Sequence, residues 1–351
     1  MKAVRETKQL GELCRIRTGK KDVNQGSPEG VFPFFTCAAE HTFSDSYSFD
    51  TEALLIAGNG NVGQVSYYNG KFEAYQRTYV ISDFENIEPR YLYLILDGKL
   101  KETVSKQKLG NTMPYIKVGM LSNFLVPLPP IAEQQRIVEI LDAAFAYIAT
   151  AKANAEKNLQ NARAIFEGHL FSIQGDQSFL GAFVDIKTGK LDANAATENG
   201  QYPFFTCAKE TYSIDTYAFD QEAILLAGNN AVGDFNVKHY DGKFNAYQRT
   251  YVISISEESK LSYRFLYYQM LKSLKRFKEQ SVGAGTKFLK LDMIKNLEIL
   301  LPDLKNQYQI VLQLDSLLEE TQSLESIYQQ KLTALDELKK SLLHQAFSGQ
   351  L

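Results

Sequence analysis

The sequence has few of the residues from which metal sites and disulfides are built. Its 351 residues include three cysteines and four histidines. No two cysteines have the CxxC spacing of a zinc or redox motif, so we expect buried thiols in a reducing compartment rather than disulfides. The histidines are scattered along the chain, which is typical of surface or core residues. These residues are Cys14, Cys37, Cys207, His41, His169, His239 and His344.

Sequence motifs of common enzyme classes are also missing. The chain has no Asn/Asp-Pro-Pro-aromatic motif of the amino-methyltransferases and no phosphate-cradling GxxxxGKS/T loop. It also lacks the HExxH motif of zinc proteases and the GxSxG motif of serine hydrolases. These absences predict a chain that is not an enzyme and that holds no cofactor or metal of its own.

Long apolar runs and a secretion signal are absent as well, so we expect no membrane span and place the protein in the cytoplasm. An apolar content of 44% and a charged content of 23% are ordinary for a soluble protein, and the length allows two domains. The net charge of −3 argues weakly against a nucleic-acid partner, but local clusters of charge matter more than their sum.

The sequence does contain an internal duplication. Residues 18–22 return as 188–192, residues 33–38 as 203–208, and residues 74–81 as 246–253. A period this long indicates a duplicated domain rather than a short-repeat solenoid. We therefore predict an α+β fold with two similar mixed α/β domains and a pseudo-twofold repeat. The domains are expected at residues 1–126 and 176–299, and long helical spacers at residues 127–175 and 300–351.

Each spacer has the pattern of one long amphipathic helix. Pro129 and Pro130 suit the first turn of a helix, and no glycine or proline follows until Gly168. Apolar residues recur at helical spacing from Ile131 to Phe166, and again over residues 310–342. About 40 residues at ~1.5 Å each would form a rod roughly 60 Å long. One such stripe would suggest a core helix, but two equal stripes predict an antiparallel two-stranded coiled coil.

Within each domain the pattern is mostly β-structure with a helix near the end. Residues 53–57 predict a short strand before a Gly/Asn turn, and residues 78–81 predict another strand. Residues 65–72 have the pattern of a hairpin with a two-residue turn at Asn69-Gly70, and Asp241-Gly242 is its copy. The helices are expected to begin near residues 91 and 265.

Residues 58–63, Gly-Asn-Gly-Asn-Val-Gly, match the dinucleotide-binding pattern GxGxxG. We reject that interpretation because the second copy lacks the middle glycine and because strands, not a helix, follow the loop. Two interpretations stay open: a tight loop that needs positive φ, or a loop that offers amide side chains to base edges. The candidate base-reading residues are Asn59, Asn61 and Gln64, with Asn229 and Asn230 in the second copy.

The octapeptide Ala-Tyr-Gln-Arg-Thr-Tyr-Val-Ile occurs unchanged in both domains. If it were a strand throughout, Tyr75, Arg77, Tyr79 and Ile81 would share one face. Such a face suits either a buried polar network or contact with phosphate and sugar, and the identity of the two copies does not separate these interpretations. The candidate nucleic-acid contacts here are Tyr75, Arg77, Tyr247 and Arg249.

A cluster of basic residues precedes each spacer. Residues 98–117 hold five lysines against one acidic residue, and residues 271–290 hold six basic residues against one acidic residue. Each cluster leads into a loop of glycine and threonine, which favours phosphate binding over a simple solvated face and would make affinity steeply salt-dependent. With the lysine of the Thr-Gly-Lys repeat, the candidates are Lys20, Lys106, Lys108, Asn111, Thr112, Lys117, Lys190, Lys275, Lys278, Thr286, Lys287 and Lys290.

The order domain, helix, domain, helix resembles the specificity subunit of type I restriction–modification systems. The resemblance rests on residues 127–138, Pro-Leu-Pro-Pro-Ile-Ala-Glu-Gln-Gln-Arg-Ile-Val, and on the tail at residues 338–351. It implies two target-recognition domains, held apart by antiparallel helices, that each read one half of a bipartite site on double-stranded DNA. It also implies docking of two methyltransferase subunits that carry S-adenosylmethionine, and of motor–nuclease subunits that use ATP and magnesium. The chain itself would be non-catalytic.

Two other roles stay open. One is the specificity subunit of a type IIB system, in which one partner both methylates and cleaves. The other is a coiled-coil adaptor that binds only protein, although the duplicated lysine clusters count against it. For the specificity subunit, the likeness of the two domains predicts a nearly palindromic, interrupted target. Its half-sites would diverge where matched positions differ, at Asn61/Ala231 and Gln64/Asp234.

Overall fold

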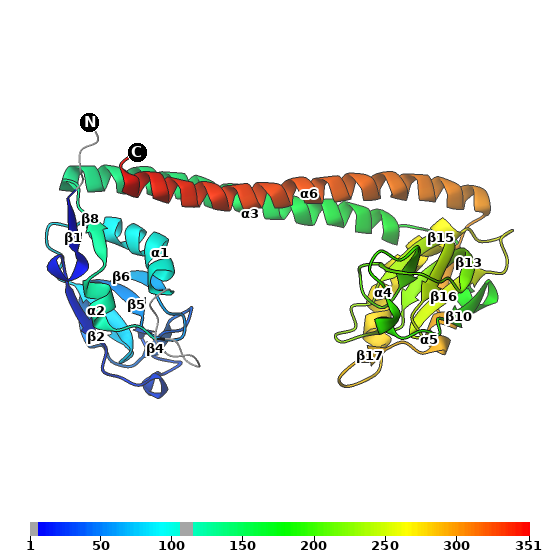
Figure 1. The fold of residues 1–351 in the computed structure, drawn as a ribbon, viewed down its shortest axis with the longest axis horizontal. Coiled ribbons are helices and arrows are strands. Elements are labelled where there is room, and N and C mark those ends of the chain that lie inside the picture. Colours follow the sequence, from blue (N-terminus) through cyan, green and yellow to red (C-terminus); the bar gives the residue numbers. More distant parts are fainter. Residues whose placement is uncertain (1–5, 106–114) are drawn as a thin grey trace. The chain divides into compact units, whose positions relative to one another are not determined.

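The computed structural model describes residues 6–105 and 115–351 (Figure 1). The chain divides into two compact units. One unit comprises Met1–Ala155 and Gln330–Leu351, and the other comprises Glu156–Gln329. Each unit therefore contains one of the two similar domains together with one part of each long helix.

The first domain is built on a six-stranded sheet with the strand order β2-β7-β5-β6-β3-β4. Neighbouring strands are antiparallel except β3 and β6, which run parallel. The long strands β5 and β6 form its centre, and their buried residues contribute to the cores on both faces. The strands are β2 (Arg15–Thr18), β3 (Phe32–Phe35), β4 (Thr42–Ser44), β5 (Phe49–Ala57), β6 (Val65–Ala74) and β7 (Thr78–Ser82).

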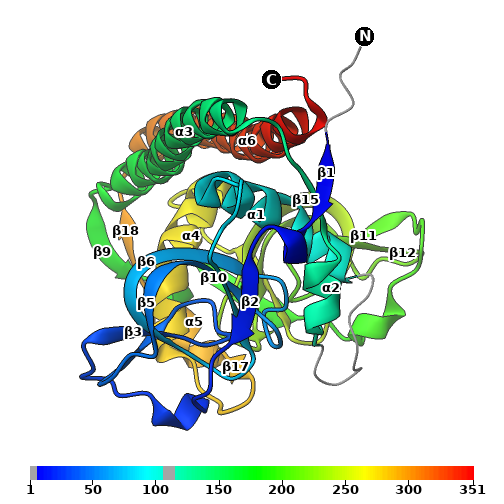
Figure 2. The same ribbon diagram turned by 90° about the vertical axis from the view of Figure 1, so that its left-hand side faces the viewer.

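Helix α1 (Pro89–Ser105) covers one face of this sheet, which confirms the predicted helix. It lies between strands β5 and β6 and the long helices of the same unit (Figure 2). Tyr91, Leu92 and Ile95 are fully buried there, and each such side chain stabilises the fold by roughly 1.5–3 kcal/mol. The remaining elements are β1 (Thr7–Gln9), η1 (Leu10–Glu12), η2 (Val23–Gln25), α2 (Val118–Ser122) and β8 (Leu125–Pro127), with β1 paired to β8.

The second domain repeats the first and adds the short ladder β14–β17, where the described part of the first domain has only a bridge between Asn59 and Tyr115. Its sheet has the order β10-β16-β13-β15-β11-β12, with the parallel pair at the same place. Its strands are β9 (Asp176–Phe179), β10 (Val184–Thr188), β11 (Tyr202–Phe205), β12 (Tyr212–Ile214), β13 (Phe219–Ala227), β14 (Asn229–Asn230), β15 (Val237–Ala246), β16 (Thr250–Ile255), β17 (Lys287–Phe288) and β18 (Glu298–Leu301). Its helices are η3 (Leu180–Ala182), η4 (Ala193–Ala195), α4 (Tyr263–Gln280) and α5 (Leu291–Lys295). The predicted duplication is confirmed.

The predicted spacers are single helices, α3 (Ile131–Phe171) and α6 (Leu304–Ser348). In the first unit, Lys152 of α3 pairs with Asp336 of α6, while the start of α3 shares a core with Phe347 at the end of α6. In the second unit, Arg163 pairs with Glu325 at 2.5 Å. The two helices are therefore antiparallel within each unit, as predicted. No helix in the described parts of the chain is long and apolar enough to cross a membrane.

The predicted hairpin at Asn69-Gly70 is wrong. Strand β6 runs straight through this dipeptide, and so does β15 through Asp241-Gly242. Gly70 adopts a φ of +133° and still pairs with Thr51 of β5. The fully buried Phe72 lies just beyond it, so pairing with the nine-residue strand β5 outweighs the local turn preference of Asn-Gly.

The octapeptide is also not a strand throughout. Strand β7 begins only at Thr78, and the three residues before it form a turn in which the Thr78 N–H donates to the Tyr75 carbonyl oxygen at 2.8 Å. The second copy has the same turn, between Tyr247 and Thr250, at 2.8 Å. The predicted shared face for Tyr75, Arg77 and the strand residues is therefore wrong, because alternation requires extended backbone at every position.

Candidate nucleic-acid interface

Residues 58–64 form the turn between β5 and β6. Gly60 and Gly63 have φ angles of +61° and +79°. A Cβ at Gly58 would lie 2.4 Å from the carbonyl oxygen of Arg77, so a side chain there would force the backbone apart. The interpretation as a tight loop that needs glycine is confirmed, and it leaves the polar side chains of the loop available for a second role.

The polar side chains of this loop differ in exposure. Asn59 is only 9% exposed, and its backbone bridges to Tyr115. Gln64 is half-buried, and its Nε2 donates to the Ala39 carbonyl oxygen at 3.0 Å. Asn61 is exposed. Of the three candidates in this loop, Asn61 is therefore the one most open to a base edge.

The second copy of the loop is two residues longer. The Ala57 N–H donates to the Gln64 carbonyl oxygen at 3.0 Å, and in the second domain the Ala227 N–H donates to that of Asn236 at 2.9 Å. Gln64 therefore corresponds to Asn236. The sequence-based pairing of Gln64 with Asp234 is wrong because the insertion falls between the last glycine of the loop and the following strand.

The longer loop is closed by its own side chains. The Asn230 Oδ1 accepts the N–H groups of Val232 and Asp234 at 2.9 and 3.1 Å. The inserted Phe235 is 4% exposed and packs into the domain core. Asn229 and Asn230 form the short strand β14, paired to β17, and both are half-buried. Side-chain acceptors thus close this loop, whereas backbone bonds close its counterpart, among them Gly63 N–H to the Ala57 carbonyl oxygen at 2.9 Å.

The turn of the octapeptide lies directly against each glycine loop. The Arg77 carbonyl oxygen accepts the Gly58 N–H at 3.0 Å, and the Arg249 carbonyl oxygen accepts the Gly228 N–H at 2.9 Å. Both arginine side chains are exposed, and Tyr75 is half-buried. An exposed guanidinium does not form a buried polar network, so the geometry favours the other interpretation of the octapeptide, contact with phosphate and sugar.

A third segment joins this site in the first domain. The Ile116 N–H donates to the Gly58 carbonyl oxygen at 3.0 Å, and the Tyr79 hydroxyl donates to the Ile116 carbonyl oxygen at 2.9 Å. The exposed Lys117 directly follows Ile116 in the chain, so these bonds bring it close to the glycine loop. A cavity of about 360 Å³ opens here, with Arg77 in its wall.

The second domain builds the same junction. The Leu289 N–H donates to the Gly228 carbonyl oxygen at 2.9 Å, and the Tyr251 hydroxyl donates to the Leu289 carbonyl oxygen at 2.8 Å. The exposed Lys290 follows Leu289 directly, and the half-buried Lys287 lies two residues before it. Each domain therefore brings a glycine loop, an arginine turn and a basic segment to one place.

Most of the other candidate residues that the structure describes are exposed. Lys275, Lys278 and Thr286 are exposed, and a Cβ at Gly233 would meet the Lys278 side chain at 3.3 Å, so this lysine borders the loop. Lys20 and Lys190 are exposed beside the octapeptide turn. Tyr247 is half-buried like Tyr75. Lys106, Lys108, Asn111 and Thr112 lie outside the described residues.

All three cysteines are free; Cys37 is buried as predicted, whereas Cys14 and Cys207 are only half-buried. Burial raises the pKa of the Cys14 thiol to about 12, so this group stays protonated at neutral pH and is a poor nucleophile. Over the residues that the structure describes, no group of three or more His, Cys, Asp and Glu side chains is arranged to hold a metal ion.

A buried glutamine attaches the first domain to its long helix. The fully buried Gln134 of α3 accepts the Glu88 N–H at 2.8 Å and donates to the Pro129 carbonyl oxygen at 2.8 Å. Two turns later, Asp142 accepts Arg90 Nε and Nη2 at 3.3 and 3.0 Å. This hydrogen bond raises the pKa of Arg90. The pair ties the start of α1 to α3.

The second domain has the same attachment. Gln307 is fully buried, accepts the Ser262 N–H at 3.0 Å and donates to the Pro302 carbonyl oxygen at 2.8 Å. Arg264 Nε donates to Asp315 at 2.7 Å. Sequence reasoning did not assign these residues a role. The available signal was a glutamine and an aspartate eight positions apart at the start of both spacers.

Comparison with known proteins follows the same division of the chain. A family model described as the type I restriction modification DNA specificity domain matches residues 5–160 and 176–334. The type I restriction enzyme EcoDI specificity subunit of Escherichia coli is 40% identical over 172 residues, which cover 49% of this chain and 37% of that protein. The type I restriction enzyme MjaVIII specificity subunit of Methanocaldococcus jannaschii is 24% identical, covering 99% of this chain and 92% of that protein.

Two solved structures share the fold. One, from work on complex assembly and conformational transition of the type I R-M system, has a TM-score of 0.75 at 17% identity and covers 99% of this chain and 98% of its own. The other is the type I restriction–modification S subunit from M. genitalium, with a TM-score of 0.51 at 16% identity and coverage of 97% and 96%.

Proposed function

We propose, for a chain that belongs to the type I restriction–modification DNA specificity family, that each of its two domains reads one half of a bipartite DNA site. The observation that carries this proposal is the same three-part constellation in both domains: glycine loop, arginine turn and basic segment. In this role the chain supplies sequence recognition and leaves catalysis to its partners.

The contacts at each site divide by chemistry. Lys117 in the first domain and Lys278 and Lys290 in the second are exposed cations beside a loop, which suits them to phosphate oxygens. Arg77 and Arg249 lie exposed on a hydrogen-bonded turn and suit bidentate contact with phosphate. Amide side chains in the glycine loops suit base edges, because Asn and Gln can bond adenine at two atoms.

The long helices are proposed to dock the methyltransferase subunits. Both helices expose large apolar side chains that the described chain does not cover, including Tyr147 at 78%, Leu312 at 71% and Tyr308 at 58%. Exposed apolar side chains of this size mark interaction surfaces when they gather on one element. S-adenosylmethionine would be held by these partners, and ATP and magnesium by motor–nuclease subunits, in the cytoplasm.

The target is proposed to be interrupted and nearly palindromic. In this proposal the two domains, which share a fold and a form of attachment to their long helix, meet DNA in opposite senses. The half-sites would diverge where the glycine loops differ, because the second loop is longer and Asn61 is matched by Ala231. A type IIB arrangement, with one partner that methylates and cleaves, would use the same recognition surfaces.

DNA binding by the assembled complex tests this role. The chain is purified with its methyltransferase subunits and titrated into a fluorescent duplex that carries the methylated host site. Binding that is weakened at least tenfold by Arg77→Ala together with Arg249→Ala is the expected result. A complex that assembles normally but binds no duplex would favour the adaptor role instead.

A further inference from the structure

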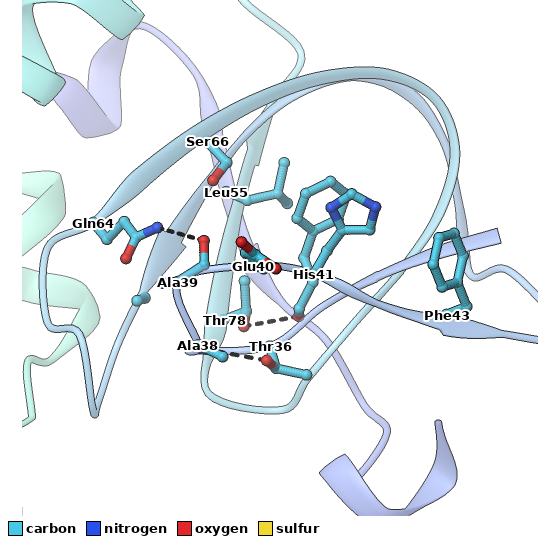
Figure 3. Close-up of a pocket in the computed structure, with 12 residues that line it drawn as sticks. Thr36, Ala38, Ala39, Glu40, His41, Phe43, Leu55, Gln64, Ser66 and Thr78 are labelled. Atoms are coloured by element: carbon cyan, nitrogen blue, oxygen red, sulfur yellow. Dashed lines mark hydrogen bonds between the residues drawn. The ribbon is translucent and has the colours of Figure 1, made fainter. Parts of the chain in front are cut away.

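A pocket beside the glycine loop is open in the first domain. Its volume is about 410 Å³ (Figure 3). Aromatic and polar groups line it together, among them Phe35, Glu40, His41 and Ser66. The Gln64 side chain, bonded to the Ala39 carbonyl oxygen, lies at one side of it, as Figure 3 shows.

The same place in the second domain is filled by a lysine. Ser66 pairs with Leu55 across the β5–β6 ladder, and Lys238 pairs with Leu225 across β13–β15, so Ser66 and Lys238 are equivalent. Backbone oxygens bind the Lys238 ammonium in this position. It donates to the carbonyl oxygens of residues 208 and 210 at 2.9 and 3.0 Å, and it lies 5.9 Å from the centre of the Phe205 ring.

The groups that receive this ammonium are also present in the first domain. The β3–β4 and β11–β12 ladders have the same register, which makes Phe35 equivalent to Phe205 and residues 38 and 40 equivalent to 208 and 210. Phe35, Ala38 and Glu40 all line the open pocket. Among the described residues that line it, none is lysine or arginine, and Glu40 supplies a carboxylate, as the equivalent Glu210 does near Lys238. The pocket thus has the receptor for a cation without the cation that fills it in the second domain.

We propose that this pocket binds a primary alkylammonium group, the terminal group of a polyamine or of a lysine side chain from another protein. The ammonium takes the place of Lys238 Nζ, with backbone carbonyl oxygens as acceptors and the Phe35 ring beneath it. The alkyl chain follows the path of the missing lysine stem past Leu55. The pocket is open in the first domain because the Ser66 side chain is too short to fill it, whereas Lys238 fills the matching place in the second domain.

Titration of the full-length chain with n-butylammonium chloride, followed by ligand-observed NMR, tests the site. The natural chain is expected to bind one equivalent, and Ser66→Lys to weaken binding at least tenfold because the new ammonium occupies the pocket. Lys238→Ser opens the matching cavity and is expected to raise the stoichiometry to two. Ser66→Ala is the matched control and leaves binding within twofold, and n-butanol, which has the same length without charge, does not compete.

The results that would overturn the proposed alkylammonium site differ from those that support it. Unchanged binding in Ser66→Lys, or no saturable binding to the natural chain, overturns the proposal. If Ser66→Lys fails to fold by circular dichroism, the stoichiometry of Lys238→Ser decides alone, and a value that stays at one contradicts the site. Putrescine and Nα-acetyl-lysine methylamide then separate the sources: the tighter ligand identifies a free polyamine or a protein side chain.

Discussion

Arg77 and Arg249 combine a structural role with the recognition role proposed for them. The carbonyl oxygen of each accepts the first N–H of its glycine loop, at 3.0 and 2.9 Å, while each guanidinium stays exposed. The backbone bond explains why the turn has the same form in both copies. The exposed cation beside the loop is the part available to DNA.

The exposed lysines are expected to act on all DNA sequences alike. In the assembled complex, Lys278→Ala with Lys290→Ala should weaken binding to specific and random duplexes together, and should lower the salt slope by about 0.9 for each phosphate that is no longer neutralised. Fluorescence anisotropy at several salt concentrations measures both effects. Lys305→Ala, an exposed lysine on α6, is the control.

The amide side chains are expected to behave differently. Asn61→Ala should relax the choice of base at one position, with discrimination reduced by about 1–3 kcal/mol and the salt slope unchanged. Asn61→Ala and the lysine pair are compared on the same duplexes. If both sets changed the salt slope alike, the division into base and phosphate contacts would be wrong.

An ion pair between a half-buried lysine and a fully buried carboxylate distinguishes the first domain from the second. Glu73 is fully buried, accepts the Ser48 hydroxyl at 2.8 Å and pairs with Lys21 at 3.4 Å, whereas the second domain has Leu191 and Asn245 at these places. Lys21→Leu alone leaves a buried carboxylate and should destabilise the first domain by about 3–5 kcal/mol.

The double variant Lys21→Leu with Glu73→Asn copies the second domain and is expected to recover most of that loss. Urea unfolding, followed by hydrogen exchange of strand β6, measures the change in the first domain. Equal destabilisation in the single and double variants would contradict an electrostatic cause and point to packing instead.

At the scale of elements, long patterns predicted the structure better than short ones. The stripes of α3 and α6 extend over about 40 residues, so their periodicity averages over many turns and the helices form where expected. The Asn69-Gly70 turn rested on two residues, and its preference was outweighed by pairing along the whole of β5. Helices α1 and α4 have patterns of intermediate length, 17 and 18 residues, and both were also predicted.

The assembly of the site depends on contacts that sequence patterns do not encode. Residue 116 meets Gly58 through a backbone bond across more than 50 positions, so no local pattern places Lys117 beside the loop. The match of Gln64 to Asn236 was missed because a two-residue insertion shifts the alignment inside the loop. The types of the candidate residues were predictable, and their proximity in space was not.

The glutamine attachments should control how firmly each domain is held on its helix. Gln134→Ala removes a side chain that satisfies backbone groups on both sides of the junction, and an unsatisfied buried N–H costs about 1–3 kcal/mol. The urea midpoint of the full chain should fall accordingly. Gln135→Ala, one position along and exposed, is the control and should change nothing; an equal fall in both variants would contradict the attachment role.

At the scale of the whole molecule, the chain consists of two equivalent domains, each attached to one of two equivalent long helices. Ladders, loop junctions and glutamine attachments repeat from one half to the other, so each domain should be exchangeable as a unit. The join points are Lys8 paired with Val126 and Ser178 paired with Ile299, which occupy the same ladder positions in the two domains.

Methylation mapping of an exchanged chain tests this claim most directly. Residues 178–299 are replaced by residues 8–126, the chain is assembled with its methyltransferase subunits, and the methylated sites are sequenced beside those of the natural complex. The natural complex should methylate two half-sites around an unread spacer, and the exchanged one should keep one half-site and repeat it in inverted order. An assembled, active exchanged complex that methylates the natural target, or a target without inverted symmetry, would contradict the assignment of one half-site to each domain.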